Sequence, residues 1–374
     1  YPVLVPMIDI NTIGAGGGSI AHVDAGGALR VGPMSAGSEP GPAAYGKGGM
    51  RPTVTDANLV LGRLDKDHFL GGEMRLDEAA AHSAIGRLGY QIGLAEVEAA
   101  EGVLTIVNSN MANAIRARTV QKGVDPRGFS LVALGGAGPL HAAEIAAMLD
   151  IPEVIVPPYP GITSAAGLLT TDLKYDLIKT EFQVADTIDV DKLNADFAAL
   201  EKQLLDQYAA DSIARDRVRL VRSGDLRYRG QGYELRVGFP DAVLDRPSLA
   251  ALWEQFHLRH EDEYGHTFRG NPVEIVNIRI TGIGEMPKIG RPMLAPGGSL
   301  AEAHIRRGQC VFRIDSVLET LDTEYYHRDR MAVGDRIDGP AIVVQLDATT
   351  VVPPAWTATV EDCGNLLLRR ENRG

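Results

Sequence analysis

The chain has 374 residues, of which 45% are hydrophobic and 23% charged, and its formal net charge is −12. This length and apolar content suffice to bury the cores of two or three domains. The acidic balance argues against nucleic acid or an anionic membrane as the main partner, because like charges repel.

Cysteine usage and apolar patterning indicate the compartment. Cys310 and Cys363 are far apart, which fits a reducing environment and gives no metal-ligand spacing. The sequence shows no apolar run of membrane-spanning length and no signal-peptide pattern. We therefore expect a soluble, cytoplasmic protein. Because the chain opens at Tyr1 in a strand-like run, we also expect it to be part of a longer protein.

Residues 14–27, GAGGGSIAHVDAGG, contain six glycines in fourteen positions. Glycine loses more conformational entropy on folding than other residues, so such a cluster indicates positive φ angles or backbone close to a ligand. The candidate ligand-binding residues of this loop are Gly14, Gly16, Gly17, Gly18 and Ser19. Ser19 has the chemistry of a nucleophile, but donating to a phosphate or capping the next element is the simpler role.

Metal-binding patterns are weak in this sequence. Asp9 with His22, or His22 with Asp24, are candidate ligands, but a single histidine beside a glycine loop is more often only hydrogen-bonded. The histidines within residues 257–266, HLRHEDEYGH, lack the H-E-x-x-H spacing of a zinc site. We expect them on a solvated helix face.

Helical periodicity follows the glycine loops. Thr55 is the expected N-cap of a helix that ends near residue 64, and further helices are predicted over residues 76–88 and 95–123. Residues 129–158 then read as a buried strand, a GGAG turn, a helix and a second buried strand. This order predicts a βαβ unit and a parallel sheet. Another helix is expected at residues 161–170.

The GGAG turn is a candidate anion site, because free N–H groups and the helix dipole meet at a helix N-terminus. The candidate cofactor-binding residues here are Gly135, Gly136, Ala137, Gly138 and His141. The simpler alternative is that the glycines only tighten the turn. A dinucleotide fingerprint is excluded because His141 stands at its third glycine, and no P-loop motif is present.

Beyond about residue 180 the pattern changes to one amphipathic helix over 191–215, a second over 248–268 and mainly short alternating strands. We therefore expect residues 1–178 to form one α/β lobe and residues 179–374 a smaller α+β module for substrate or partner contact. Residues 225–237, which include Arg227 and Tyr233, are its expected contact surface. An exposed two-stranded ribbon with solvated arginines is an equally good interpretation.

Several long blocks resemble the hydantoinase A/5-oxoprolinase family, which includes the ATP-binding subunits of acetone and acetophenone carboxylases. They include VPMIDINTIGAGGGSIAHVDAGG, MANAIRARTVQKGVDPRGFSLVALGGAGPLHAAEIAAML, RYRGQGYEL and GPAIVVQLDATTVVPPAWTATVEDCGNLLL. The resemblance implies the second lobe of an actin-like fold, shared with sugar kinases and heat-shock chaperones, that binds ATP and Mg²⁺. It implies that Gly135 to Gly138 face the adenosine and that the GAGGGS loop faces the ribose and phosphates.

The sequence also departs from this family. Both phosphate hairpins of the D-x-G-G-T type are absent from the 374 residues, so the chain alone is not expected to hydrolyse ATP. Asn11, His22 and Ala44 stand where the family usually has His, Trp and Cys. The pattern identifies no catalytic residue.

The resemblance implies that the source protein opens a cyclic amide, such as a hydantoin, 5-oxoproline or another lactam, at the expense of ATP. Its expected partner is a hydantoinase B-like subunit or domain in an oligomer. Two alternatives stay open at this point: an ATP-dependent ketone carboxylase subunit, and a degenerate nucleotide-binding scaffold.

Overall fold

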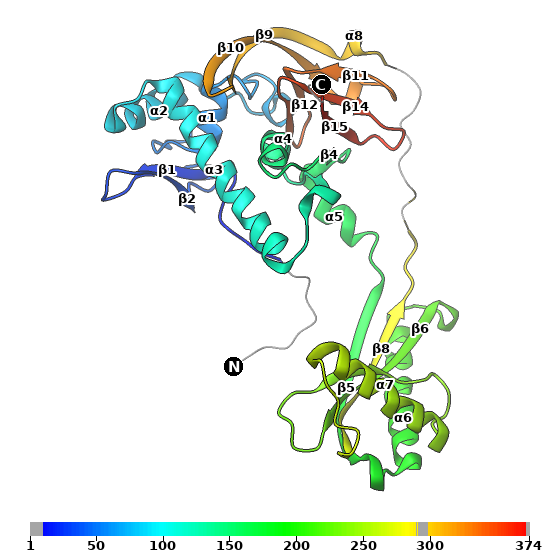
Figure 1. Cartoon of the computed structure of the whole chain (residues 1–374). Helices are drawn as coiled ribbons and strands as arrows, with labels where there is room; N and C mark the ends of the chain where they lie inside the picture. Colours follow the sequence, from blue (N-terminus) through cyan, green and yellow to red (C-terminus); the bar gives the residue numbers. More distant parts are fainter. Residues whose placement is uncertain (1–9, 289, 291–297, 372–374) are drawn as a thin grey trace. The chain divides into compact units, whose positions relative to one another are not determined.

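A computed structural model describes residues 10–288, 290 and 298–371 (Figure 1). The chain forms two compact units, one made of Tyr1–Ala166 with Gly290–Gly374 and the other of Gly167–Ile289. The metal candidate Asp9 lies outside the described residues. Within the described ranges, we find no helix with the length and apolar character that crossing a membrane requires.

The first unit contains a five-stranded sheet with the order β11-β14-β15-β4-β3. The predicted βαβ unit is confirmed, because β3 pairs in parallel with β4 and α4 connects them. The other pairs in this sheet are antiparallel. The bounds are β3 Ser130–Val132, α4 Gly138–Met148, β4 Glu153–Val156, β11 Arg336–Asp338, β14 Trp356–Val360 and β15 Leu366–Arg370.

Two further sheets belong to the first unit. One has the order β13-β12-β10-β9, in which β9 and β10 form a long antiparallel hairpin, and the other is the pair β1-β2. The bounds are β1 Ser19–Val23, β2 Leu29–Ser35, β9 His304–Ile314, β10 Val317–His327, β12 Ala341–Val344 and β13 Thr349–Val352.

Each helix predicted for residues 55–170 is found, with ends that differ by a few residues, whereas the short α8 was not predicted. The Thr53 hydroxyl accepts from the Asp56 N–H, and the Asp56 carboxylate accepts from the Thr53 N–H. This reciprocal pair of hydrogen bonds satisfies backbone N–H groups at the helix start that have no partner within the helix. Thr53 is therefore the N-cap, and the predicted cap Thr55 lies in the first turn. The bounds are α1 Val54–Val60, α2 Glu78–Ile92, α3 Glu96–Arg118, α5 Thr163–Leu168 and α8 Leu300–Ala303.

The last strands of the chain return to the first unit. Leu366 and Leu368 of β15 pair with Val156 and Val154 of β4, and all four lie in one apolar core. The structure therefore divides the chain differently from the expected boundary at residue 178. The alternating pattern of β15 indicates a buried face, but it does not identify a partner strand so far away in sequence.

The second unit is an antiparallel sheet, order β5-β8-β6-β7, with two helices. Its first and last strands pair with each other, so that Leu173 lies opposite Gly284. Phe197 of α6 and Phe256 of α7 are fully buried in the same core as Ile278 of β8. The bounds are β5 Leu173–Val184, α6 Val190–Ala210, β6 Val218–Tyr228, β7 Leu235–Gly238, α7 Arg246–Tyr264 and β8 Val273–Gly284.

The expectation of a solvated histidine face on α7 is wrong for two of its residues. His257 and His260 are buried against Tyr228. Nδ1 of His257 lies 2.7 Å from the Tyr228 hydroxyl, and Nδ1 of His260 lies 2.7 Å from the carbonyl oxygen of His266. Both rings therefore lie in the core of the second unit, where they contact aromatic side chains instead of water.

Candidate functional site

The two glycine-rich segments meet in the first unit. A Cβ atom on Gly17 would lie 2.8 Å from Oγ1 of Thr55 and 3.9 Å from Cβ of Ala137. The N–H and the hydroxyl of Thr55 both donate to the Gly17 carbonyl, each over 2.9 Å. Close backbone approach, and not a positive φ, therefore explains the glycine at this position.

The loop before β1 is closed by its own side chain. The Ser19 hydroxyl accepts from the Gly16 N–H at 2.9 Å and donates to the Gly14 carbonyl at 3.1 Å. Gly14 has a φ of +62°, which favours glycine. Because the Ser19 side chain is 3% exposed, its hydroxyl serves the shape of the loop in this structure.

The GGAG turn joins β3 to α4. Gly135 has a φ of +79°, and its N–H donates to the Pro160 carbonyl at 2.7 Å. A Cβ atom on Gly136 would lie 3.3 Å from the backbone oxygen of Asp347, so this turn is tightly enclosed. Ala137 provides no capping side chain for α4, which starts at Gly138. The helix dipole favours an anion at this end, although Pro139 carries no N–H and the Leu140 N–H donates to the Ala137 carbonyl at 3.2 Å.

A cavity of about 330 Å³ lies where these segments meet. Its size is within the range of small-molecule sites. Its lining includes glycine backbone and the hydroxyl groups of Tyr45 and Thr55 as well as apolar side chains. The apolar side chains are those of Leu64, Phe69, Leu70, Leu140 and Leu346. Such a mixed lining is compatible with a ligand that has both a flat apolar ring and a charged end.

Asp56 holds the segment that carries Tyr45. Its buried carboxylate accepts the N–H groups of Ala43 and Ala44 as well as both donors of Thr53. Burial raises the pKa of Asp56, although these hydrogen bonds oppose the change. Burial also raises the pKa of Tyr45, whose hydroxyl therefore stays protonated and can donate in the cavity.

The segment between β12 and β13, residues 345–348, also lines the cavity. Asp347 accepts the Gly161 N–H at 2.8 Å through Oδ2 and a Gln345 amide N–H at 2.7 Å through Oδ1. The same Gln345 nitrogen donates to the Pro158 carbonyl at 3.0 Å. These bonds tie the segment between β12 and β13 to the loop after β4.

His141 lies behind the site. Its side chain is 1% exposed, and Nδ1 lies 2.8 Å from Oδ1 of Asn108. Asn108 donates its amide to Glu144 at 2.6 Å, and Glu144 also accepts from Arg63 at 2.8 Å. Burial first, and then the Arg63 charge, lowers the pKa of His141 to about 4. His141 is thus a neutral buried group that supports α4, with no surface open to the cavity.

The remaining metal candidates do not converge. Asp24 accepts from Arg30 at 2.8 Å and from the N–H groups of Gly26 and Ala28, within the β1–β2 turn. The hydrogen bond from Arg30 is the main cause that lowers the pKa of Asp24. His22 lines a different cavity. Across the described ranges, no group of three or more His, Cys, Asp or Glu side chains is arranged to hold a metal ion.

Sequence reasoning missed several residues of this site. Tyr45, Gln345 and Asp347 lie in GPAAYG and QLDATT, which resembled family segments but contain no motif with a known chemical role. Their position became visible only from the packing of distant segments.

Comparison with known proteins supports the resemblance. The hydantoinase/oxoprolinase model matches residues 1–177, and the model of the hydantoinase/oxoprolinase C-terminal domain matches residues 183–371. The chain belongs to the hydantoinase/oxoprolinase family. The two family-model matches meet close to the boundary expected at residue 178. The contacts within the structure instead divide the chain after Ala166 and before Gly290.

Several relatives have named activities. The chain is 37% identical to caprolactamase subunit alpha of Pseudomonas jessenii, over 96% of this chain and 52% of that protein. It is 30% identical to the acetophenone carboxylase gamma subunit of Aromatoleum aromaticum, over 98% of this chain and 52% of the relative. With 5-oxoprolinase 1 of Arabidopsis thaliana the identity is 30%, over 99% and 30% of the two chains.

Solved structures give the same result. A nucleotide-free acetone carboxylase structure superimposes with a TM-score of 0.85 at 27% identity, over 96% of this chain and 52% of that chain. The ATP-dependent caprolactamase of Pseudomonas jessenii gives 0.76 at 36% identity, over 98% and 53%. These matches show a mixed α/β fold of this family. The chain spans about half the length of these relatives, and less of the oxoprolinase.

Proposed function

We propose that this chain is the nucleotide-holding part of an ATP-dependent hydrolase that opens a cyclic amide such as a hydantoin, 5-oxoproline or a related lactam. One observation carries the proposal: two glycine segments far apart in sequence, together with the start of α4, border one cavity. In this proposal the first unit includes the second lobe of an actin-like ATPase.

The residues present suit a nucleotide. Gly17, Gly18 and Gly136 leave backbone bare in the lining of the cavity, and the start of α4 favours an anion. Phe69 and Leu140 supply an apolar surface for a ring. ATP, when bound, supplies a phosphoryl group that makes an amide oxygen a better leaving group. We assign no described residue to Mg²⁺, because the described residues include no group of three or more His, Cys, Asp or Glu side chains arranged to hold a metal ion.

The partners belong to the same proposal. Relatives are named as subunits of caprolactamase and of acetophenone and acetone carboxylase, so multi-subunit assembly is usual among them. We propose a hydantoinase B-like subunit or domain as the partner of this chain, in an oligomer that acts on a small cyclic amide in the cytoplasm.

A glycine substitution tests the site. Gly136→Val places a β-branched side chain against the Asp347 backbone oxygen and the cavity, and should abolish ATP binding measured by calorimetry while circular dichroism stays unchanged. Gly128→Val is the matched control, because a Cβ there meets no atom within 4 Å. Equal ATP affinity of the two variants and the unmodified chain would remove this cavity from the nucleotide site.

A carboxylase subunit is the second candidate. The acetone carboxylase structure has the higher TM-score of the two matches, 0.85 against 0.76. Turnover by the assembled protein separates the candidates: ATP cleavage stimulated by cyclic amides supports the hydrolase, and cleavage stimulated by a ketone with bicarbonate supports the carboxylase. A chain that binds no nucleotide would instead be a scaffold.

A further inference from the structure

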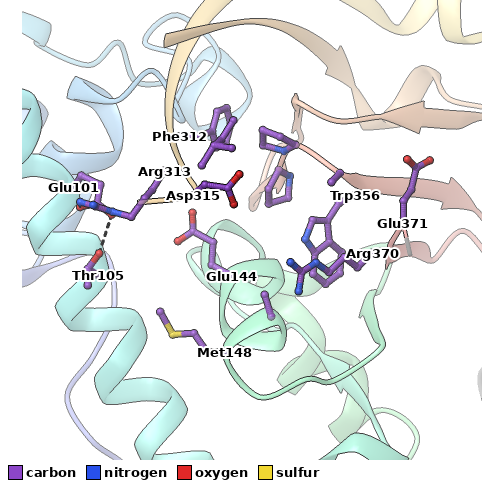
Figure 2. A pocket seen from close by; sticks show the side chains of 15 residues that line it. Glu101, Thr105, Glu144, Met148, Phe312, Arg313, Asp315, Trp356, Arg370 and Glu371 are labelled. Carbon is purple, nitrogen blue, oxygen red and sulfur yellow. Dashed lines mark hydrogen bonds and ion pairs between the residues drawn. The ribbon is translucent and has the colours of Figure 1, made fainter. Parts of the chain in front are cut away.

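A second and larger cavity, of about 570 Å³, lies elsewhere in the first unit (Figure 2). Two of the acidic side chains that border it, Glu101 and Glu144, already have arginine partners within the protein. The candidate nucleotide cavity differs in one respect. Two large apolar side chains that line it, Leu70 and Leu346, stay exposed.

Leu70 and Leu346 form the leucine rim of the candidate nucleotide cavity. Leu70 is 41% exposed and Leu346 is 57% exposed, whereas Leu64 and Leu140, which line the same cavity, are buried. Among the residues that the structure describes, neither side chain of the leucine rim is part of an apolar core. Packing within the fold therefore does not explain why both side chains are apolar.

The backbone at Leu70 is a second, independent observation. Leu70 has a φ of +51° and a ψ of +45°, a left-handed conformation that is unfavourable for a residue with a Cβ atom. Gly71 and Gly72, which follow, also have positive φ values, but they lack the Cβ atom that makes the conformation costly. Non-glycine residues held in such conformations are concentrated at ligand clamps and switch regions. This position indicates that the leucine side chain itself has a use.

Two close approaches place the leucine rim beside the GGAG turn. A Cβ atom on Gly71 would lie 2.8 Å from Cδ1 of Leu346, so the segment 69–72 is in contact with the segment of Leu346. The segment of Leu346 also reaches the GGAG turn, because a Cβ atom on Gly136 would lie 3.3 Å from the Asp347 backbone oxygen. The leucine rim therefore adjoins the turn that the proposed function assigns to adenosine.

We propose that the leucine rim packs against the base of the bound nucleotide and makes binding depend on that base. This inference rests on the proposed function. A base has flat faces of low polarity, and covering one of them with leucine side chains removes apolar surface of both partners from water. The glycine segments lack side chains and the start of α4 favours an anion, so neither provides this contact.

Leu70→Asn tests the proposal, because asparagine adopts the left-handed conformation more readily and removes the apolar contact. Calorimetric titration of the full chain with ATP and, separately, with adenosine should show both affinities reduced about tenfold. The loss should be equal for the two ligands, since both carry the base. The midpoint of denaturant unfolding should not fall, because the exposed side chain belongs to no apolar core among the described residues.

Ser212→Asn is the matched control. Ser212 is an exposed residue of the second unit, has a φ of +62° and does not line the cavity. This variant should change neither the ATP nor the adenosine affinity by more than about twofold. Leu346→Ala, at the other side chain of the leucine rim, should instead weaken both ligands as Leu70→Asn does.

Three results would each overturn the proposal. They are unchanged affinities in Leu70→Asn, a loss for ATP without a loss for adenosine, and a lower unfolding midpoint for Leu70→Asn than for Ser212→Asn. The last of these would show that Leu70 serves the fold and not the ligand. If the unmodified chain bound neither ATP nor adenosine, the proposed function would fail and this inference with it.

Discussion

The hydroxyl and the N–H of Thr55 both donate to the carbonyl oxygen of Gly17, each over 2.9 Å. These two hydrogen bonds to one oxygen attach the first glycine loop to the start of α1. It also brings Gly17 to the edge of the turn that holds Ala137. The position of the loop is therefore set by a helix that lies later in the chain.

Substitution of two neighbouring glycines tests this relationship. Gly17→Ala places a Cβ atom 2.8 Å from Thr55 Oγ1, so the loop or the helix must shift. We expect a loss of about 1–3 kcal/mol in the free energy of unfolding and weaker nucleotide binding. At Gly16 a Cβ atom would meet no atom within 4 Å. Gly16→Ala should therefore change the free energy of unfolding by no more than about 0.5 kcal/mol. Equal denaturant midpoints for the two variants would contradict the close approach.

The buried His141 predicts acid sensitivity. Its pKa is lowered from 6.5 to about 4 by burial and then by Arg63, so the unfolded chain takes up a proton at higher pH than the folded chain. The stability due to the neutral ring is fully present above about pH 6.5 and is lost as the pH falls toward 4. The resulting loss in the free energy of unfolding is roughly 3 kcal/mol.

Denaturant unfolding near pH 7 and near pH 5 measures this effect. His141→Gln should flatten the difference between the two conditions, because the amide does not titrate. His304→Gln serves as the control, since His304 is exposed on β9 beside Glu324. If the His304 variant flattened the profile and the His141 variant did not, the acid-sensitive group would lie elsewhere.

ATP turnover by the chain alone is expected to be absent. The 374 residues contain no D-x-G-G-T hairpin, and the described residues offer no acidic cluster for a metal ion. Phosphate release by the purified chain with ATP and Mg²⁺ should therefore equal that of a buffer blank. Steady release that survives repeated purification would show that other residues supply the missing contacts.

The β6–β7 turn is the expected partner surface of the second unit. Tyr233 is 82% exposed there, whereas Arg227 is bound to Glu274 at 2.9 Å and also contacts Glu234. Tyr233→Ala should therefore weaken association with a hydantoinase B-like subunit at least about tenfold without changing nucleotide affinity. Tyr90→Ala, at a tyrosine that is 90% exposed on α2, is the control. Loss of nucleotide affinity with intact assembly would show that the turn has another role.

Local features could be predicted from the sequence because their causes are local. The GGAG turn between β3 and α4 follows from glycine geometry and apolar patterning over one short stretch. The N-cap of α1 was misplaced by two residues, since both Thr53 and Thr55 can cap a helix. Only the reciprocal bonds between Thr53 and Asp56 distinguish them.

Non-local features could not be predicted in this way. The pairing of β15 with β4 depends on a match between two apolar strands from opposite ends of the chain. For the same reason, the sequence around Asp347, whose carboxylate accepts the Gly161 N–H, does not predict that this residue lies at the site. The burial of His260 was missed because its neighbours Tyr228 and Phe268 come from other elements.

The pairing of β5 with β8 makes the second unit self-contained. Its first and last strands lie side by side, so the chain enters and leaves this unit at neighbouring points. Among the described residues, its apolar core draws on residues between Tyr175 and Ile280. A polypeptide of residues 167–288 therefore carries its whole core with it, and this segment can be exchanged between relatives as one block, as inserted domains with adjacent ends commonly are.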